Sequence, residues 1–536
     1  MSTSEDLEFI ADGINASTGA PIAGPTTLDE FVALAESSAK ARDEGEQELL
    51  DIKKGEGGAH FGTARGIDPA NLAETGWCVV LPAAKPGSDE DRRHAAILAA
   101  LKPLLDHRKR QATQDKESYY RELRHDKGYQ PGETGRAFLG RLGIDPSQPA
   151  DPENLPYYIL LLASPEEIPF SVQYQLDVIY AVGRLHFNAL DDYARYAQSV
   201  VESETRPLKL AREIAFFGVA NPDDKATKLS RETLVAPLAD VLQNTKRRAK
   251  DRDLETWKVS RYFDDAASKA TLGTLLGGDK TPALLFTASH GVNFNVGDNR
   301  QERHQGALLC ADWENPRPFV PLSENVYFSG DDVSSTGSLH GLIAFNFACY
   351  GAGTPDVNAY LHKEAPGATR RIAARPFVAN LPRTLLAHPR GGALAAIGHI
   401  ERAWSDSLPS ADGANRLVAF RSVVETLMKG LPVGCATEYL NDRYAYYGTE
   451  IATQVQALEY PPDDAAKVLK MKKDLVRTWT THNDARDYVV TGDPAVRLNI
   501  LDDAARSKPR EALSLRGADN ATPAPASAAP APAPSP

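Results

Sequence analysis

The 536-residue sequence contains no run of about 18 apolar residues, which is what a membrane-spanning helix requires. Its first residues, MSTSEDLEFIADG, are acidic and lack the positively charged start and apolar core of a secretory signal. The four cysteines lie far apart and form no CxxC pair, which argues against a disulfide framework or a structural zinc site. We therefore expect no membrane contact and a reducing, cytoplasmic setting in which a thiol stays usable.

Positive charge is also in deficit, because 60 Lys and Arg residues against 72 Asp and Glu residues give a net charge of −12. Nucleic-acid binding needs a basic face, so no nucleic-acid partner is expected. The sequence contains no phosphate loop, dinucleotide fingerprint or GxSxG elbow, and we expect no cofactor. What is present is the composition of a globular protein, with 42% hydrophobic and 25% charged residues.

Short apolar segments alternate with helical patterns along most of the chain. The expected strands are 77–83, 157–163, 177–185, 213–220, 283–289, 342–348, 392–399 and 488–498. The expected helices are 89–113, 188–203, 229–249, 264–276, 376–388, 412–430, 434–457 and 462–480. Uniformly apolar strands that alternate with helices predict an α/β fold with a mostly parallel sheet and helices on both faces.

The same patterns divide the chain into four parts. Residues 1–75 form an acidic N-terminal region in which 27–53 has the pattern of an amphipathic helix. This region has three open interpretations: an autoinhibitory piece, a docking helix, or neither. We expect an N-terminal α/β subdomain over 76–205 and a second α/β domain over 206–505. Residues 506–536, rich in Ala and Pro, should form a disordered, polyproline-like tail.

Two of the expected strands end in residues that can do chemistry. LLFTAS is followed by His290 and Gly291, and LIAFNFA is followed by Cys349 and the glycines of YGAG. Parallel sheets place their ligands at the carboxyl ends of the strands. A cysteine nucleophile needs a base, for which His290 is suitable, and N–H donors for the oxyanion, for which the amides of Gly291 and Cys349 are candidates. A buried structural cysteine and a packed histidine are the alternative, but the pairing of two such strand ends favours the catalytic interpretation.

These two stretches resemble the His-Gly and Ala-Cys motifs of the caspase-like cysteine proteases, and within that clan the gingipain-type and CHAT-type peptidases. Three further stretches add to the likeness. YYILLLASPEEIPF with DVIYAVGRL resembles the family's strand–IP–strand–GR signature, GGALAAIGHIERAW the strand after the nucleophile, and TGDPAVRL the terminal GDP strand. The resemblance covers about residues 156–498. It departs from the family at Ala163-Ser164, where Gly-Asp is usual, and we expect this to affect only a loop turn.

The resemblance implies a caspase-haemoglobinase-like fold, with residues 206–505 as the catalytic domain of a cysteine endopeptidase that cleaves proteins or peptides. It carries over His290 as the general base, Cys349 as the nucleophile and Gly291 as the oxyanion glycine. It also implies that Trp404 is the aromatic wall of the pocket for the residue before the scissile bond, with a core position as the alternative. Enzymes of this kind are often switched on by another protein, so an activating partner is expected besides the substrate.

Gingipain-type enzymes also carry two acids in the loop after an earlier strand, one near the histidine and one at the pocket floor. The corresponding loop is GVANPDDKATKLS, whose only acids are Asp223 and Asp224. The position near the histidine falls at Ala220 or Asn221, so we expect a Cys–His dyad without a carboxylate behind it. If Asp223 or Asp224 lines the pocket, the preferred substrate residue would be Arg or Lys. The alternative is that NPDD forms a turn and a helix cap.

Two other interpretations complete the prediction. The polar, glycine-rich insertion 292–340 is typical of a mobile loop or cleavable linker over the cleft, with a plain surface loop as the alternative. His304 and Cys310, together with His290, match no zinc spacing, and no metal is expected. One alternative function for the whole chain is a non-catalytic scaffold of the same fold, acting through its N-terminal helix and Pro-rich tail. Another is a different hydrolase or acyltransferase that uses the same thiol.

Overall fold

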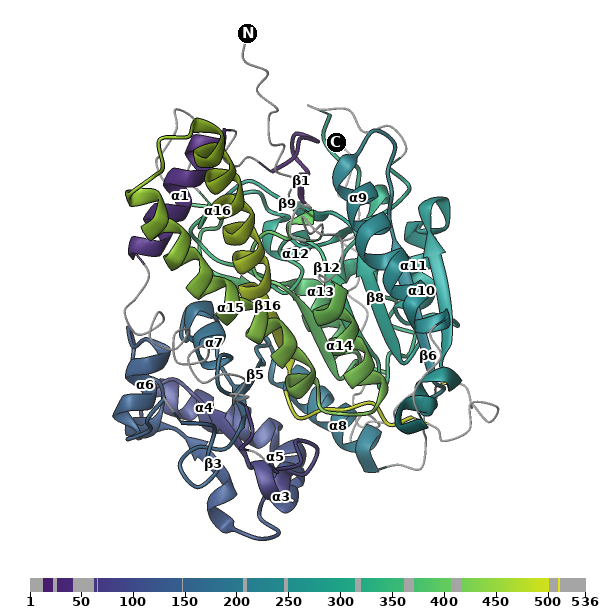
Figure 1. The fold of residues 1–536 in the computed structure, drawn as a ribbon. Helices are drawn as coiled ribbons and strands as arrows, with labels where there is room; N and C mark the ends of the chain where they lie inside the picture. Colours follow the sequence, from purple (N-terminus) through teal and green to yellow (C-terminus); the bar gives the residue numbers. More distant parts are fainter. Residues whose placement is uncertain are drawn as a thin grey trace, which may run out of the picture.

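The central feature of the computed structural model is a large mixed sheet (Figure 1). The structure describes the chain apart from residues 1–12, 23–26, 42–61, 65, 147, 206–209, 245–248, 314–319, 361–370, 406–407, 409–416, 501–509 and 511–536. In the described part, ten strands pair in the order β3-β2-β4-β5-β16-β15-β12-β8-β6-β7. Their bounds are β2 (Trp77–Val80), β3 (Tyr120–Leu123), β4 (Tyr158–Leu161), β5 (Ala181–Arg184), β6 (Glu213–Gly218), β7 (Lys258–Phe263), β8 (Leu284–Ala288), β12 (Ile343–Phe347), β15 (Ala395–His399) and β16 (Tyr488–Gly492). All neighbours are parallel except β15 and β16, where the two halves of the sheet meet antiparallel.

Every strand expected from the apolar pattern lies in this sheet, which confirms the α/β fold with a mostly parallel sheet. Every residue of β4, β5, β8, β12, β15 and β16 is buried, so both faces of the sheet are covered. The two strands that the pattern missed, β3 and β7, form the two edges of the sheet. Most of their residues are half-buried or exposed, and edge strands of this kind carry polar residues that hide the apolar signal.

Helices connect the strands, and α14 and α15 lie in front of the sheet in Figure 1. Their bounds are α3 (Leu72–Thr75), α4 (Asp89–Ala100), α5 (Lys102–Ala112), α6 (Gly135–Arg141), α7 (Phe170–Leu176), α8 (Leu190–Thr205), α9 (Lys225–Ser230), α10 (Ala236–Asn244), α11 (Lys269–Leu275), α12 (Gln301–His304), α13 (Asn380–Leu386), α14 (Leu417–Met428), α15 (Val433–Glu459) and α16 (Ala465–Arg486). The expected helix 89–113 is broken at Leu101, because Pro103 has no N–H with which to continue it. None of the helices in the described ranges combines the length and the apolar character that a bilayer crossing needs.

The turn after β16 contacts the N-terminal part of the chain through Asp493, which is fully buried. Its carboxylate accepts hydrogen bonds from Trp77 Nε1 at 2.9 Å and from Arg108 Nε at 2.7 Å. Trp77 is the first residue of β2 and Arg108 lies on α5. These hydrogen bonds therefore connect the segment after β16 to the N-terminal half of the chain. The division at residue 205 stays a prediction, and the continuous sheet runs across it.

A second, smaller sheet combines three strands from the segment after His290 with one strand from the N-terminal region. Its strands pair in the order β1-β9-β10-β11, with β1 (Gly13–Asn15), β9 (Gly291–Asn293), β10 (Leu308–Leu309) and β11 (Tyr327–Phe328). A two-stranded pair, β13 (Gly353–Thr354) with β14 (Phe377–Val378), follows it along the chain. The described residues of 292–340 thus contain short strands and a helix, and a role as a mobile loop or cleavable linker stays a prediction.

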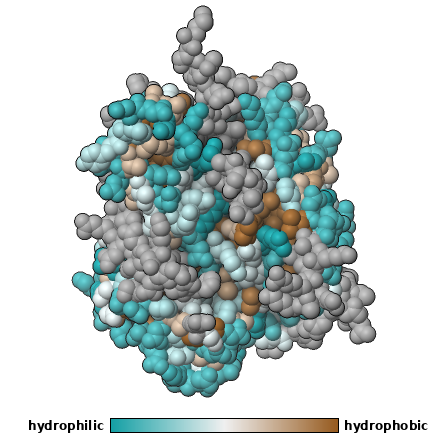
Figure 2. Space-filling model, in the orientation of Figure 1, coloured by the Kyte–Doolittle hydropathy of each residue, from teal (hydrophilic) through white to brown (hydrophobic). Residues whose placement is uncertain are grey.

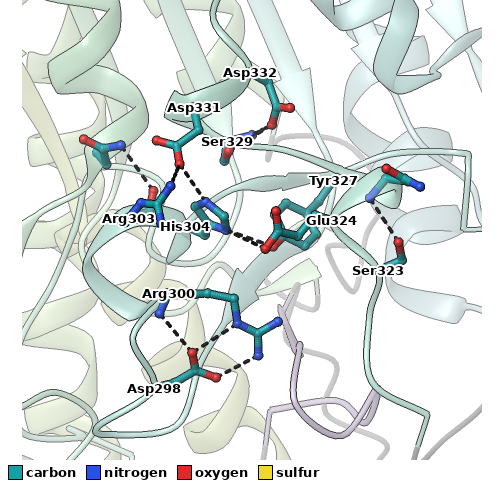
Figure 3. Close-up of polar contacts among 12 residues, drawn as sticks. Asp298, Arg300, Arg303, His304, Ser323, Glu324, Tyr327, Ser329, Asp331 and Asp332 are labelled. Carbon is teal, nitrogen blue, oxygen red and sulfur yellow. Dashed lines mark hydrogen bonds and ion pairs between the residues drawn. The ribbon is translucent and has the colours of Figure 1, made fainter. Parts of the chain in front are cut away.

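Polar contacts hold this insertion in shape, as Figure 3 shows. His304 Nδ1 lies 2.9 Å from the Tyr327 hydroxyl and His304 Nε2 lies 3.1 Å from Asp331 Oδ2. Asp298 and Arg300 form an ion pair of 2.8 Å. His304 thus serves the fold, and within the described ranges no three His, Cys, Asp or Glu side chains gather as a metal site would require.

The N-terminal region lies against the C-terminal helices. The helix α1 (Leu28–Ala41) packs on α15 and α16 (Figure 1). An ion pair of 2.8 Å joins Asp29 to Lys472. This confirms the expected amphipathic helix over 28–41, while the rest of 27–53 and most of the tail 506–536 lie outside the described residues.

The face drawn in Figure 2 is mainly hydrophilic, with a smaller hydrophobic group near its centre.

Candidate active site

His290 and Cys349 leave the large sheet side by side. The strands β8 and β12 that carry them are parallel neighbours, with Ala288 opposite Phe347 in the register. The Ser289 N–H continues the ladder by donating to Phe347 O at 3.2 Å. Two apolar strands of equal length therefore place an imidazole and a thiol side by side at their carboxyl ends.

Gly291 permits this approach because its backbone touches that of Cys349. A Cβ placed on Gly291 would lie 1.8 Å from Cys349 O and 2.8 Å from Cys349 N. No side chain fits at that distance, so the position accepts only glycine. The two amides expected to serve the oxyanion thus belong to backbone segments in direct contact.

The Cys349 thiol is completely buried, at 0% exposure. The Ala403 N–H donates to Cys349 Sγ at 3.2 Å, a contact that suits a sulfur carrying negative charge. Burial raises the pKa of Cys435 to about 12 and raises the pKa of Cys78 and Cys310 further.

The turn after Cys349 is held in an unusual conformation by the end of β15. Tyr350 has φ of 59°, in the left-handed region that a bulky residue seldom adopts. Its N–H donates to Glu401 O at 2.8 Å, and its hydroxyl donates to Glu401 Oε1 at 2.9 Å. Glu401 therefore fixes both the backbone and the side chain of the residue that follows the thiol.

The buried carboxyl of Glu401 should make folding stability depend on pH. Burial raises the pKa of Glu401 from 4.5 to about 7. A raised folded-state pKa means that the native protein retains a proton that the unfolded chain has lost between pH 4.5 and 7. The stabilisation of the folded state by this protonated carboxyl is complete below pH 4.5 and is lost as the pH rises through 7. Relative to the variant Glu401→Gln, the protein should lose about 3 kcal/mol of unfolding free energy over that interval.

Urea unfolding of the protein and of Glu401→Gln at pH 5 and at pH 8 measures this difference directly. The variant keeps a neutral side chain at both values, so it removes this contribution and leaves the remaining titrations in place. Equal stability differences at the two pH values would contradict the assignment of a raised pKa to Glu401.

A carboxylate does stand behind His290, contrary to the expected dyad. Asp224 Oδ2 lies 2.7 Å from His290 Nε2, with both side chains largely shielded from solvent. Burial acts to raise the pKa of Asp224, but the charge and hydrogen bond of His290, with hydrogen bonds from Thr227 and the Ala226 N–H, keep it below its usual value. The position near the histidine is thus occupied by Asp224 and not by Ala220 or Asn221.

The sequence indicated that NPDD could cap a helix, but it did not indicate that the Asp224 carboxylate would also contact His290. Asp224 is the N-cap of α9, accepting from Ala226 N at 3.2 Å and from the Thr227 hydroxyl at 2.7 Å. The turn and cap expected from NPDD are therefore confirmed. Asp223 before it has φ of 54° and is exposed. That the capped carboxylate also meets His290, 66 residues further along the chain, depends on how α9 packs on the sheet.

Trp404 is buried, at 2% exposure, in an aromatic cluster. Its ring lies 5.0 Å from Tyr360 and 6.1 Å from Phe31 of α1, measured between centroids. This matches the core position that the sequence left open as the alternative, and a role as pocket wall stays a prediction. Trp404 directly follows Ala403, whose amide contacts the thiol.

Comparisons with known proteins add little to this geometry. No family model matches the sequence, and no curated protein is significantly similar to it. A solved structure described as "Structure of Protease" aligns with 80% of this chain and 79% of its own, at 10% sequence identity and a TM-score of 0.40. At that TM-score the match carries no argument about function.

Proposed function

We propose that this chain is a cysteine endopeptidase of caspase-like fold, with Cys349 as nucleophile, His290 as proton carrier and Asp224 as the residue that positions His290. The observation that carries the proposal is the hydrogen bond of 2.7 Å between His290 and the largely shielded carboxylate of Asp224, at the carboxyl ends of the paired strands that lead to His290 and Cys349. A thiol, an imidazole and an orienting acid form the constellation that activates a nucleophile. The five ordered motifs that resemble gingipain-type and CHAT-type peptidases support the same function.

In this mechanism the Cys349 thiol gives its proton to His290, and Sγ attacks the carbonyl carbon of the scissile bond. The carbonyl oxygen becomes an oxyanion held by the amides of Gly291 and Cys349. The C–N bond then breaks, and the leaving amine takes a proton from His290. A thioester remains on Cys349. His290 next takes a proton from water, whose oxygen attacks the thioester and releases the acid and the thiol. Asp224 engages Nε2, so Nδ1 is the nitrogen that exchanges the proton.

The two acids of the loop before α9 also bear on which substrate residue is preferred. Because Asp224 is committed to His290, Asp223 is left as the acid that would favour Arg or Lys before the scissile bond. Cleavage of a positional peptide library should then show Arg or Lys enriched at that position. Enrichment of Leu, Met or Asp there would contradict a specificity role for Asp223.

The function is tested by trapping the nucleophile. Peptidyl ketones that alkylate thiols, ending in Arg, Leu or Asp, are incubated in excess with the protein, and mass spectrometry locates the adduct. We expect the adduct on Cys349, and we expect the replacement His290→Ala to slow its formation by about tenfold or more. An adduct formed equally fast without His290, or formed on another cysteine, would rule out the proposed roles of Cys349 and His290 and favour the non-catalytic scaffold.

A further inference from the structure

A strand from the N-terminal region lies directly on the candidate nucleophile. The strand β1 pairs in parallel with β9, and the register places Gly13 opposite Gly291, the residue after His290. A Cβ placed on Gly13 would lie 3.0 Å from Cys349 Sγ. The backbone of Gly13 therefore covers the thiol, whose exposure is 0%.

Residues 13–22 fold back on themselves and form what we call the N-terminal hairpin. Asn15 N–H donates to Ala20 O at 2.8 Å, and Ile22 N–H donates to Gly13 O at 3.0 Å. A Cβ on Gly13 would lie only 2.0 Å from Ile22 Cδ1. Residue 13 is thus enclosed between Ile22 and the thiol, and any side chain there must displace one of them.

The hairpin is anchored on the small sheet beside the site. Ile14 and Ala16 are buried in a cluster with Val292, Phe294 and Leu309. The other edge of β9 is already paired with β10, where Leu308 lies opposite Gly291. The hairpin therefore fills the remaining edge of β9, and an open strand edge is a template on which another extended chain can pair.

The next described segment reaches the site from a second side. Helix α1 places Phe31 at 6.1 Å from Trp404, centroid to centroid, and Trp404 follows the residue whose amide contacts Cys349. The N-terminal region thus meets both the sulfur and the backbone segment that supports it. The contact with the sulfur is carried by a strand of only three residues, and local opening in proteins draws on short segments of this kind.

We propose that the N-terminal hairpin is an intramolecular plug on Cys349, and that the thiol becomes reactive only when the hairpin leaves the edge of β9. Its consequence for activity rests on the proposed peptidase function, but the occlusion of the thiol does not. Departure of the hairpin exposes the nucleophile and the β9 edge together. The same event would therefore free the thiol and open a strand edge to an extended polypeptide.

The rate at which iodoacetamide alkylates Cys349 in the full chain reports the plug, with the modified peptide quantified by mass spectrometry. The replacement Gly13→Leu cannot fit between Ile22 and the thiol, and we expect it to raise the rate by about tenfold or more. The matched control is Gly140→Leu. Gly140 lies in α6 with no neighbouring atom within 4 Å of its Cβ position, and this variant should leave the rate unchanged.

A second variant works in the opposite direction and does not depend on destabilising the hairpin. Asn15 and Asn293 are register partners whose side-chain amides lie 3.4 Å apart, so cysteines at both positions can be oxidised to lock β1 on β9. The oxidised Asn15→Cys/Asn293→Cys protein should alkylate at Cys349 about tenfold more slowly than the same protein after reduction. Its melting temperature and circular dichroism confirm that it is folded.

The outcomes separate the plug from the peptidase. Equal alkylation rates in the unaltered chain, the Gly13→Leu variant and the locked protein would overturn the plug. Faster alkylation in Gly13→Leu without hydrolysis of any library peptide would uphold the plug and overturn the proposed function. Faster alkylation together with new hydrolysis would uphold both.

Discussion

Replacing Cys349 with alanine should lower peptide hydrolysis by about 10⁴-fold or more, because the variant cannot form the thioester through which the proposed reaction proceeds. His290, Asp224 and the oxyanion amides would remain, but without a nucleophile they supply only the small residual acceleration seen in comparable sites. The measurement is kcat/KM on the best peptide from the library, determined in the Gly13→Leu background so that the thiol is accessible.

The matched control for this variant is Cys310→Ala. Cys310 is equally buried, and its Sγ donates to the Leu308 carbonyl at 3.4 Å within the small sheet. Both replacements remove one buried sulfur, so they should cost similar amounts of stability, on the order of 1 kcal/mol. Loss of activity in both variants would point to unfolding, and full activity in Cys349→Ala would exclude Cys349 as the nucleophile.

Replacing Asp224 with asparagine should lower kcat by about 10²- to 10⁴-fold and leave KM nearly unchanged. An amide can neither stabilise the imidazolium that forms during proton transfer nor hold the same tautomer of His290 as firmly as a carboxylate. Asparagine is as good an N-cap as aspartate, so α9 keeps its first turn and the fold should be unaffected. A change confined to kcat separates a positioning role from a merely structural one.

Asp464→Asn provides the control for this replacement. Asp464 caps α16 as Asp224 caps α9, and its carboxylate accepts from Ala466 N at 3.0 Å. Unlike Asp224, it makes no hydrogen bond to a histidine among the described residues. The two variants change the same charge at the same kind of helix end. If Asp464→Asn lowered kcat as much as Asp224→Asn, the effect would belong to helix capping and not to His290.

The strands that carry the site could be predicted because they are buried on both faces and therefore read as continuous apolar runs. The edge strands β3 and β7 could not, because their exposed residues dilute that pattern. The small sheet was missed for another reason. Its strands are only two or three residues long, and such short segments have no periodicity from which a strand can be inferred.

The sequence by itself determined which residues could do chemistry and where they would emerge. Apolar strands that end at His290-Gly291 and at Cys349 are local features, and local features are written in consecutive residues. Tertiary structure decided which partners those residues meet. The carboxylate of Asp224 and the backbone of Gly13 reach the site from segments far away in the chain, through packing that no local pattern encodes. Their positions depend on how α9 and the N-terminal hairpin pack against the strands that carry His290 and Cys349, and this packing exists only in the folded chain.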